Sequence, residues 1–200
     1  MKNSLWAKLL PPGGPVEQTV VDPSQNLDWG VEFQTGRVTV TLAKVLRHVK
    51  PDGTIVTLPV LPGFYSAFIR TVVDEKVISG TLKQMSVSSN EVGFAVAPRI
   101  IGHGAPDANG NLRITIGEEF DPLDANLEDA IQVIVDGEVY TRSTNNRPAN
   151  PREFSVTNNP SNAIRLKLHF AVTVTQPQAY PFRLIVNGAE SAPFWIELNP

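Results

Sequence analysis

Cysteine is absent from the 200 residues of this sequence. Its absence excludes a disulfide framework, a thiolate nucleophile and a zinc site made of cysteine ligands. A chain without cysteine also suits the reducing cytoplasm, and we expect the protein to be made and folded there.

Long hydrophobic runs are absent as well. No segment approaches the roughly 20 apolar residues that a membrane-spanning helix requires, so we expect no direct membrane insertion. The N-terminal segment holds only a short apolar patch, which ends at Pro11 and Pro12. That patch is too short for the hydrophobic part of a secretory signal.

Charge is scarce and nearly balanced: 18% of the residues are charged, and the formal net charge is −3. The lysines and arginines are dispersed, so we expect no extended positive face that would release counterions from a nucleic-acid backbone. Nucleic acid is therefore not an expected partner. The apolar content of 42% is enough to build a folded core.

What the sequence does contain is a pattern of short strands and turns. Its 17 prolines and 14 glycines are set among valine, isoleucine, threonine and phenylalanine, which favours β-strands over long helices. Apolar and polar residues alternate in residues 36–46 and, most clearly, in residues 164–170. Asp136-Gly137 and Asn187-Gly188 separate apolar runs in the manner of hairpin turns. The fold class is predicted to be all-β.

Two parts of the chain end in a similar way. An aromatic-led strand, a polar turn and a last strand that contains phenylalanine occur in residues 65–96 and again in residues 180–196. A recurring closing hairpin is typical of duplicated immunoglobulin-like modules. We therefore predict two tandem immunoglobulin-like β-sandwich modules, at residues 22–98 and 99–200, after a short N-terminal arm at residues 1–21.

No arrangement of ionisable residues in the sequence predicts a reaction. His48, His103 and His169 fall in different settings. None of them has a partner at the spacing of a metal site or a catalytic triad. We predict a non-enzymatic protein with no catalytic residue, no metal site and no cofactor.

Three polar segments leave alternatives open. Asp107, Asn109 and Asn111 are compatible with the start of a calcium loop, although we favour a polar hairpin turn. The acidic residues between 118 and 129 either surround a hard cation or, as we favour, face water. Residues 143–163 form either a contact loop for a sugar or a protein, or an ordinary surface loop.

The N-terminal arm holds the predicted partner-binding residues, which are Leu5, Trp6, Leu9 and Leu10. If residues 3–10 form a helical turn, these side chains share one side, because positions four apart are neighbours on a helix. Such an apolar patch either folds back on its own module or docks in a groove on another subunit.

Two segments resemble a known family. Residues 88–100 (SSNEVGFAVAPRI), which follow LPGFY at 61–65, resemble the junction between immunoglobulin-like modules in the cap proteins of phage-tail-like contractile injection systems. Residues 179–193 (AYPFRLIVNGAESAP) resemble the closing strand of that family, in which a variant of RVDGAESP recurs. Their order and spacing extend the resemblance over most of residues 30–200.

The resemblance implies a structural role in an oligomeric particle. In that family, the cap closes the end of the contractile sheath and the inner tube and holds the two together. By resemblance, this chain is a cap or terminal adaptor, present in several copies in a ring and bound to sheath, tube or other cap proteins. The particle would assemble in the cytoplasm. Family members usually carry a larger amino-terminal domain, so the resemblance points to an accessory cap component held through its arm.

Two rival functions remain. A pair of carbohydrate- or surface-binding modules would use residues 145–162 as its contact loop, and an exposed tryptophan or tyrosine platform beside that loop would favour it. An enzyme with dispersed catalytic carboxylates would need two acidic groups that converge in a cleft.

Overall fold

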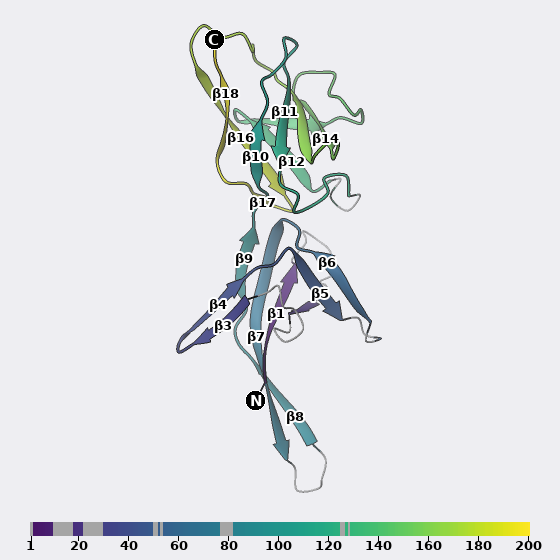
Figure 1. The fold of residues 1–200 in the computed structure, drawn as a ribbon, viewed down its shortest axis with the longest axis vertical. Coiled ribbons are helices and arrows are strands. Elements are labelled where there is room, and N and C mark those ends of the chain that lie inside the picture. The colour runs from purple at the N-terminus through teal and green to yellow at the C-terminus, as the bar shows by residue number, and fades with distance from the viewer. Residues whose placement is uncertain are drawn as a thin grey trace. The chain divides into compact units, whose positions relative to one another are not determined.

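The structure is a computed structural model that describes residues 2–9, 18–21, 30–49, 52, 54–76, 82–124, 127 and 129–200. Its contacts divide the chain into two units, Met1–Ala95 (unit 1) and Val96–Pro200 (unit 2). The described residues form β-strands and no α-helix (Figure 1), which confirms the predicted all-β class. No helix among them is long and apolar enough to cross a membrane.

Unit 2 is one nine-stranded sheet. Its strands are β10 (Ile100–His103), β11 (Asn111–Ile116), β12 (Ile131–Val135), β13 (Glu138–Arg142), β14 (Glu153–Thr157), β15 (Ala163–Lys167), β16 (Gln178–Val186), β17 (Ala189–Glu190) and β18 (Phe194–Leu198). Their order is β10-β11-β15-β14-β13-β12-β16, and both β17 and β18 then pair with β16. The pair β13–β14 is parallel and joins two antiparallel halves, β10-β11-β15-β14 and β13-β12-β16-β18.

The core of unit 2 takes alternate residues from both halves of the sheet. In β11, Leu112, Ile114 and Ile116 are buried and the residues between them are not, as the two-residue period of a strand requires. In β16, Phe182 and Leu184 are at most 1% exposed. Each fully buried side chain of this kind contributes roughly 1.5–3 kcal/mol to folding. Other fully buried side chains of both halves are those of Val133, Val135, Phe154, Ile164, Leu166 and Ile196.

Two-residue turns fix the register of two hairpins in unit 2. Asp136 and Gly137 have φ angles of 51° and 80°, and Asn187 and Gly188 have φ angles of 49° and 80°. Positive φ at both central residues defines the type I′ turn, whose twist matches that of the flanking strands. The hairpins predicted at these residues are confirmed by the pairing of β12 with β13 and of β16 with β17.

Unit 1 is organised around β7 (Gly63–Lys76). Its other strands are β1 (Lys2–Leu9), β2 (Gln18–Val21), β3 (Gly30–Gln34), β4 (Arg37–Thr41), β5 (Val45–Val49), β6 (Ile55–Pro59), β8 (Leu82–Ser88) and β9 (Val92–Val96). One edge of β7 pairs with β1, which also pairs with β2, and the other edge pairs with β8 and β9. The pairs β3–β4 and β5–β6 form separate two-stranded ribbons, which project to the left and to the right in Figure 1.

The two units share the order of the strands around one long strand. In each unit a long strand, β7 or β16, pairs on one edge with the first strand of an antiparallel pair, β1–β2 or β12–β13. On its other edge it pairs with two successive closing strands, β8 and β9 or β17 and β18. The closing end of each unit, which the sequence predicted to be alike, is therefore built in the same way.

A serine lies between the closing strands of both units. Ser89 donates its N–H to the Ile69 carbonyl (2.8 Å), and its Oγ accepts the Ile69 N–H (2.9 Å). Ser191 makes the same two bonds with Leu184, at 2.8 and 3.3 Å. These bonds make Ile69 the counterpart of Leu184, and they place Tyr65 and Tyr180 at matching positions, four residues earlier in each strand.

Some predictions about unit 1 are wrong. Residues 2–9 form strand β1, not the helical turn expected over residues 3–10. The backbone of β1 pairs with β7, which lies far along the chain, and local residue spacing cannot reveal such a partner. The single strand expected over residues 36–46 is divided between β4 and β5, and β8 was not predicted. The boundaries predicted for the arm (residues 1–21) and the two modules (residues 22–98 and 99–200) stay predictions.

The type I′ geometry predicts a difference between two glycines in open surroundings. A Cβ atom added at Gly137 or at Gly104 would meet no atom within 4 Å, but only Gly137 has a left-handed φ, of 80°. Gly137→Ala should therefore lower the free energy of unfolding by about 1–2 kcal/mol, since an L-residue is strained in that region. Gly104→Ala should change it by less than about 0.5 kcal/mol. Urea unfolding of the two variants checks this, and equal effects would contradict the assigned turn.

Candidate functional site

An apolar groove of about 390 Å³ lies in unit 1, between the ribbon β3–β4 and the strands β7 and β9. Alternate residues of β4 and its C-terminal continuation, Val38, Val40 and Leu42, form one wall. The opposite wall is formed by Ala67, Phe68, Ile69, Ser89, Asn90, Val92 and Phe94. The alternation of Val38, Val40 and Leu42 was apparent in the sequence, but the strand that they face was not.

The position that this groove occupies in unit 1 is filled by buried side chains at the equivalent position in unit 2. Leu184 of β16 is fully buried, whereas its counterpart Ile69 in β7 is half-buried and lines the groove. Leu42 and Val92 on the two walls are 41% and 66% exposed. The apolar face of the unit 1 sheet is therefore only partly covered by the described residues of the chain.

Tyr65 fixes the base of β7 next to the groove. Its hydroxyl donates a hydrogen bond to the Leu61 carbonyl (2.7 Å), and its ring stacks on Phe94 with a centroid distance of 5.4 Å. Burial raises the pKa of the Tyr65 phenol to about 12. The stack holds β9 against β7 and so keeps the Phe94 wall of the groove in place.

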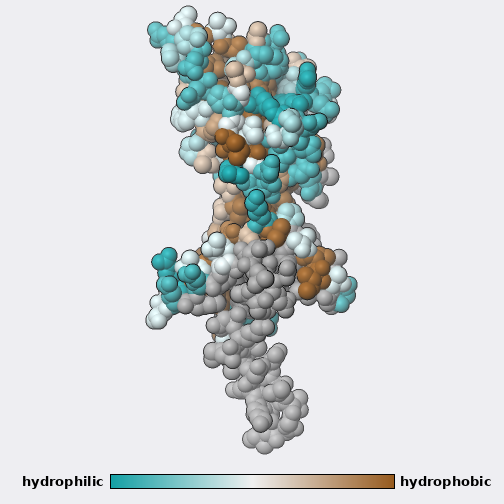
Figure 2. All heavy atoms as spheres, in the orientation of Figure 1, coloured by the Kyte–Doolittle hydropathy of each residue, from teal (hydrophilic) through white to brown (hydrophobic). Residues whose placement is uncertain are grey.

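Strands β6 and β8 of unit 1 expose further apolar side chains. Ile55 at the start of β6 is 54% exposed and Val87 of β8 is 66% exposed. Figure 2 shows a hydrophobic patch on the surface of the ribbon β5–β6. A two-stranded ribbon is only marginally stable in water unless another element packs on it. Contact with another molecule would stabilise these ribbons.

The four predicted partner-binding residues lie at the start of unit 1. Leu5, Trp6 and Leu9 belong to β1, where their backbones pair with Ile69, Phe68 and Tyr65 of β7. Leu10 lies outside the described residues. We expected these side chains to share one side because of helical spacing, but residues 2–9 form a strand. Their role in binding a partner stays a prediction.

Two of the three histidines take part in local packing. The Nε2 of His103 accepts the Glu197 N–H (3.3 Å), which leaves Nδ1 to donate to the Gly104 carbonyl (2.8 Å). The Nδ1 of His169 shares a hydrogen bond of 3.0 Å with the Tyr140 hydroxyl. His48 lies in β5. In the part of the chain that the structure describes, no three histidine, aspartate or glutamate side chains are grouped as a metal site requires.

The Asp107 carboxylate organises the predicted hairpin turn between β10 and β11. One oxygen accepts the N–H groups of Asn109 and Asn111 (both 2.9 Å), and the other accepts the Asn111 side-chain amide (2.7 Å). The Asn111 side chain is the main cause that lowers the pKa of Asp107 below its ordinary value. Both oxygens of this carboxylate are engaged in the turn.

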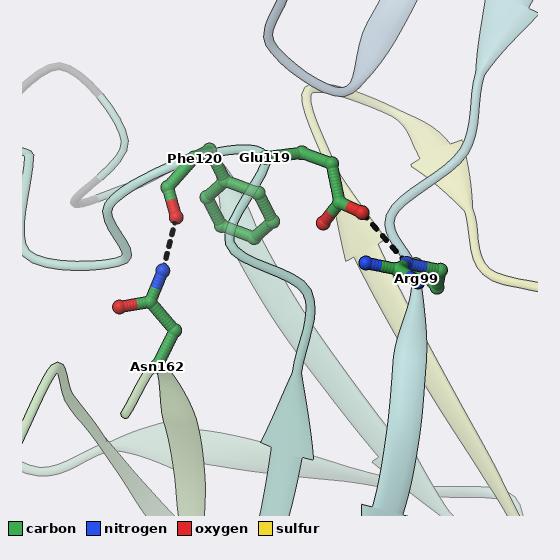
Figure 3. A network of polar contacts seen from close by, with 4 residues as sticks. All are labelled: Arg99, Glu119, Phe120 and Asn162. Carbon is green, nitrogen blue, oxygen red and sulfur yellow. Dashed lines mark hydrogen bonds and ion pairs between the residues drawn. The ribbon is translucent and has the colours of Figure 1, made fainter. Parts of the chain in front are cut away.

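The acidic segment after β11 is anchored at two points (Figure 3). Glu119 pairs with Arg99 at 2.6 Å, and the Asn162 side-chain amide donates to the Phe120 carbonyl at 2.6 Å. The Phe120 side chain is buried. Residues 125, 126 and 128 of this segment lie outside the described residues.

The long polar segment 143–163 contains β14, and the Asn146 carbonyl in its first part accepts hydrogen bonds from side chains of β14 and β15. The Ser155 hydroxyl donates to the Asn146 carbonyl (2.9 Å), which draws the loop over β14. Tyr140 and Phe154, the aromatic residues nearest to this loop in the sequence, are 3% and 1% exposed. Both belong to the core, and neither offers a flat aromatic surface to a ligand.

Neither the comparison with protein-family models nor the comparison with curated proteins found a match for this chain.

Two buried tyrosines should ionise at a higher pH than an ordinary phenol. Burial raises the pKa of Tyr65 and of Tyr140 from 10.0 to about 12. Because the folded state favours the neutral phenols, this stabilisation is complete below pH 10 and is lost as the pH rises from 10 to 12. Phenolate absorbance should show two late-ionising tyrosines, and Tyr65→Phe and Tyr140→Phe should each remove one. Ionisation of Tyr65 and Tyr140 near pH 10 would contradict these environments.

Proposed function

We propose that the chain is a structural subunit of a multi-subunit particle, in which a neighbouring subunit covers the apolar groove of unit 1. The observation that carries the proposal is the contrast between the matching strands: Leu184 in β16 is fully buried, whereas Ile69 in β7 lines an open groove. Apolar surface left in water costs roughly 25 cal/mol per Å², so covering this groove is favourable. The occupant that fits is an aliphatic strand or sheet face, the kind of surface that closes the core of unit 2.

We propose that both units are immunoglobulin-like modules. When the strands of unit 2 are lettered in chain order, its halves have the order ABED and C′CFG, which is the order of an immunoglobulin-like sandwich. Unit 1 repeats the C′CFG order with β2, β1, β7 and β9. Tyr65 adds support, because a tyrosine near the start of strand F that bonds to the backbone a few residues upstream is a mark of this architecture.

The particular particle that we propose is a phage-tail-like contractile injection system, with this chain as a cap or terminal adaptor bound to sheath, tube or other cap proteins. The support is the resemblance of residues 88–100 and 179–193 to the cap family. Both segments include the serine that lies between the closing strands, Ser89 in one and Ser191 in the other. The resemblance and the shared strand order therefore concern the same part of each unit.

The rival proposal, a pair of carbohydrate- or surface-binding modules, receives less support. It needs an exposed aromatic platform beside residues 145–162. Tyr140 and Phe154 are instead part of the core.

Substitution in the groove tests the proposed function. Val92→Glu changes a residue that is 66% exposed, so the chain should still fold, but a charge in the groove would have to be desolvated when a subunit docks. We expect the variant to be at least about tenfold depleted from purified sheath–tube particles. Val139→Glu, at an equally exposed valine of unit 2 (65%), is the matched control and should be incorporated normally.

Two results would contradict the proposal. Normal incorporation of Val92→Glu would show that the groove does not hold the subunit. Absence of the unaltered chain from the purified particles would show that the cap or adaptor function is wrong.

A further inference from the structure

Three arginines line a second groove, of about 310 Å³, on the outer face of unit 2. Arg113 of β11 and Arg165 of β15 come from the sheet, and Arg147 comes from the loop that precedes β14. The turn between β10 and β11 contributes Asp107 to the same groove. Its lining is both polar and apolar, whereas that of unit 1 is mostly apolar, and Arg113 and Arg165 alternate along their strands with the buried Leu112 and Leu166.

Arg113 and Arg165 face each other directly. They form a cross-strand pair in the antiparallel ladder of β11 and β15. Like charges opposite one another on the same face of a sheet are destabilising. Burial and the charge of Arg165 lower the pKa of the Arg113 guanidinium. Negative charge placed between the two side chains would relieve this repulsion.

Among the residues that the structure describes, none of the three arginines forms an ion pair, and Asp107 is the one carboxylate in the lining of the groove. Arg113 donates to the carbonyl of Ser161 (2.7 Å) and Arg165 to the carbonyl of Asn146 (3.0 Å), which orients both guanidiniums without neutralising them. Both oxygens of Asp107 are taken up by the β10–β11 turn. The guanidiniums of Arg99, Arg152 and Arg183, by contrast, each pair with a glutamate.

Complementary charge lies elsewhere on the same unit. Glu118 and Asp121 follow the end of β11, are exposed, and have no ion-pair partner among the residues that the structure describes. The arginine groove is lined by residues at the start of β11 and by the turn that precedes this strand. One molecule therefore presents a groove with three arginines and one carboxylate, and a segment with two carboxylates that form no ion pair within the described residues, at different ends of one strand.

We propose that the arginine groove of one copy of this chain binds the acidic segment 118–121 of a second copy. Planar guanidiniums match carboxylates in a bidentate geometry, so three of them in one groove suit this occupant. The contact joins two different surfaces and is heterologous, which allows it to repeat around a closed ring. It goes beyond the proposed function, which concerns the apolar groove of unit 1 and other subunits.

Charge reversal of each surface tests the proposal. The groove variant carries Arg113→Glu and Arg165→Glu, and the segment variant carries Glu118→Arg and Asp121→Arg. Sedimentation velocity at low ionic strength should show self-association of the unaltered chain that added salt weakens, with a dissociation constant at least about tenfold higher for either variant. An equimolar mixture of the two variants should associate again, because each then meets a surface of opposite charge.

Further variants keep the test decisive. Arg147→Glu alters a loop residue and should weaken association even if the groove variant folds poorly, while Arg37→Glu, an exposed arginine of unit 1, is the matched control and should have no effect. A monomeric unaltered chain at all concentrations, or two variants that fail to associate when mixed, would overturn the proposal. Binding of inorganic phosphate or a single-stranded oligonucleotide to the groove, with self-association unchanged by the substitutions, would also overturn it.

Discussion

Each unit depends on one long strand that is hydrogen-bonded along both edges. In unit 2 this strand is β16, and in unit 1 it is β7. Because both edges are occupied, the alternate side chains of the strand are committed to two defined faces. The serine between the closing strands, Ser89 or Ser191, bonds to the backbone of the long strand and sets where the last strand begins. The long strand therefore determines where the core of each unit lies and which apolar surface stays exposed.

The two units share the strands around the long strand but differ in how the apolar face of those strands is covered. In unit 2 the half-sheet β10-β11-β15-β14 supplies buried side chains that complete the core around Phe182 and Leu184. In unit 1 the ribbon β3–β4 supplies Val38 and Val40, and an apolar groove is left between them and β7. Hydrophobic surface of this kind is typical of a protein whose core is completed on assembly. The core of unit 2 is closed among the described residues, and the groove of unit 1 is the surface on which we propose that a neighbour docks.

The parts of this fold that the sequence predicts are those with a local cause. Asp136-Gly137 and Asn187-Gly188 adopt positive φ within two residues, and residues 164–167 of the predicted alternation lie within the single strand β15. The strand at residues 2–9 could not be predicted in this way, because its conformation is set by a distant partner, β7. The two grooves could not be predicted for the same reason. Arg113 lies opposite Arg165, and β4 lies opposite β7, because segments far apart in the sequence pair and pack together.

Amide hydrogen exchange, measured on the free chain and on the chain within the particle, tests most directly whether unit 1 is completed by its neighbours. Exchange reports the free energy of local opening, which is low where few apolar side chains are buried. We expect slow exchange of β12 and β16 in both samples. We expect fast exchange of β7 and β9 in the free chain and slow exchange in the particle. Equal protection of β7 and β16 in the free chain would contradict this expectation.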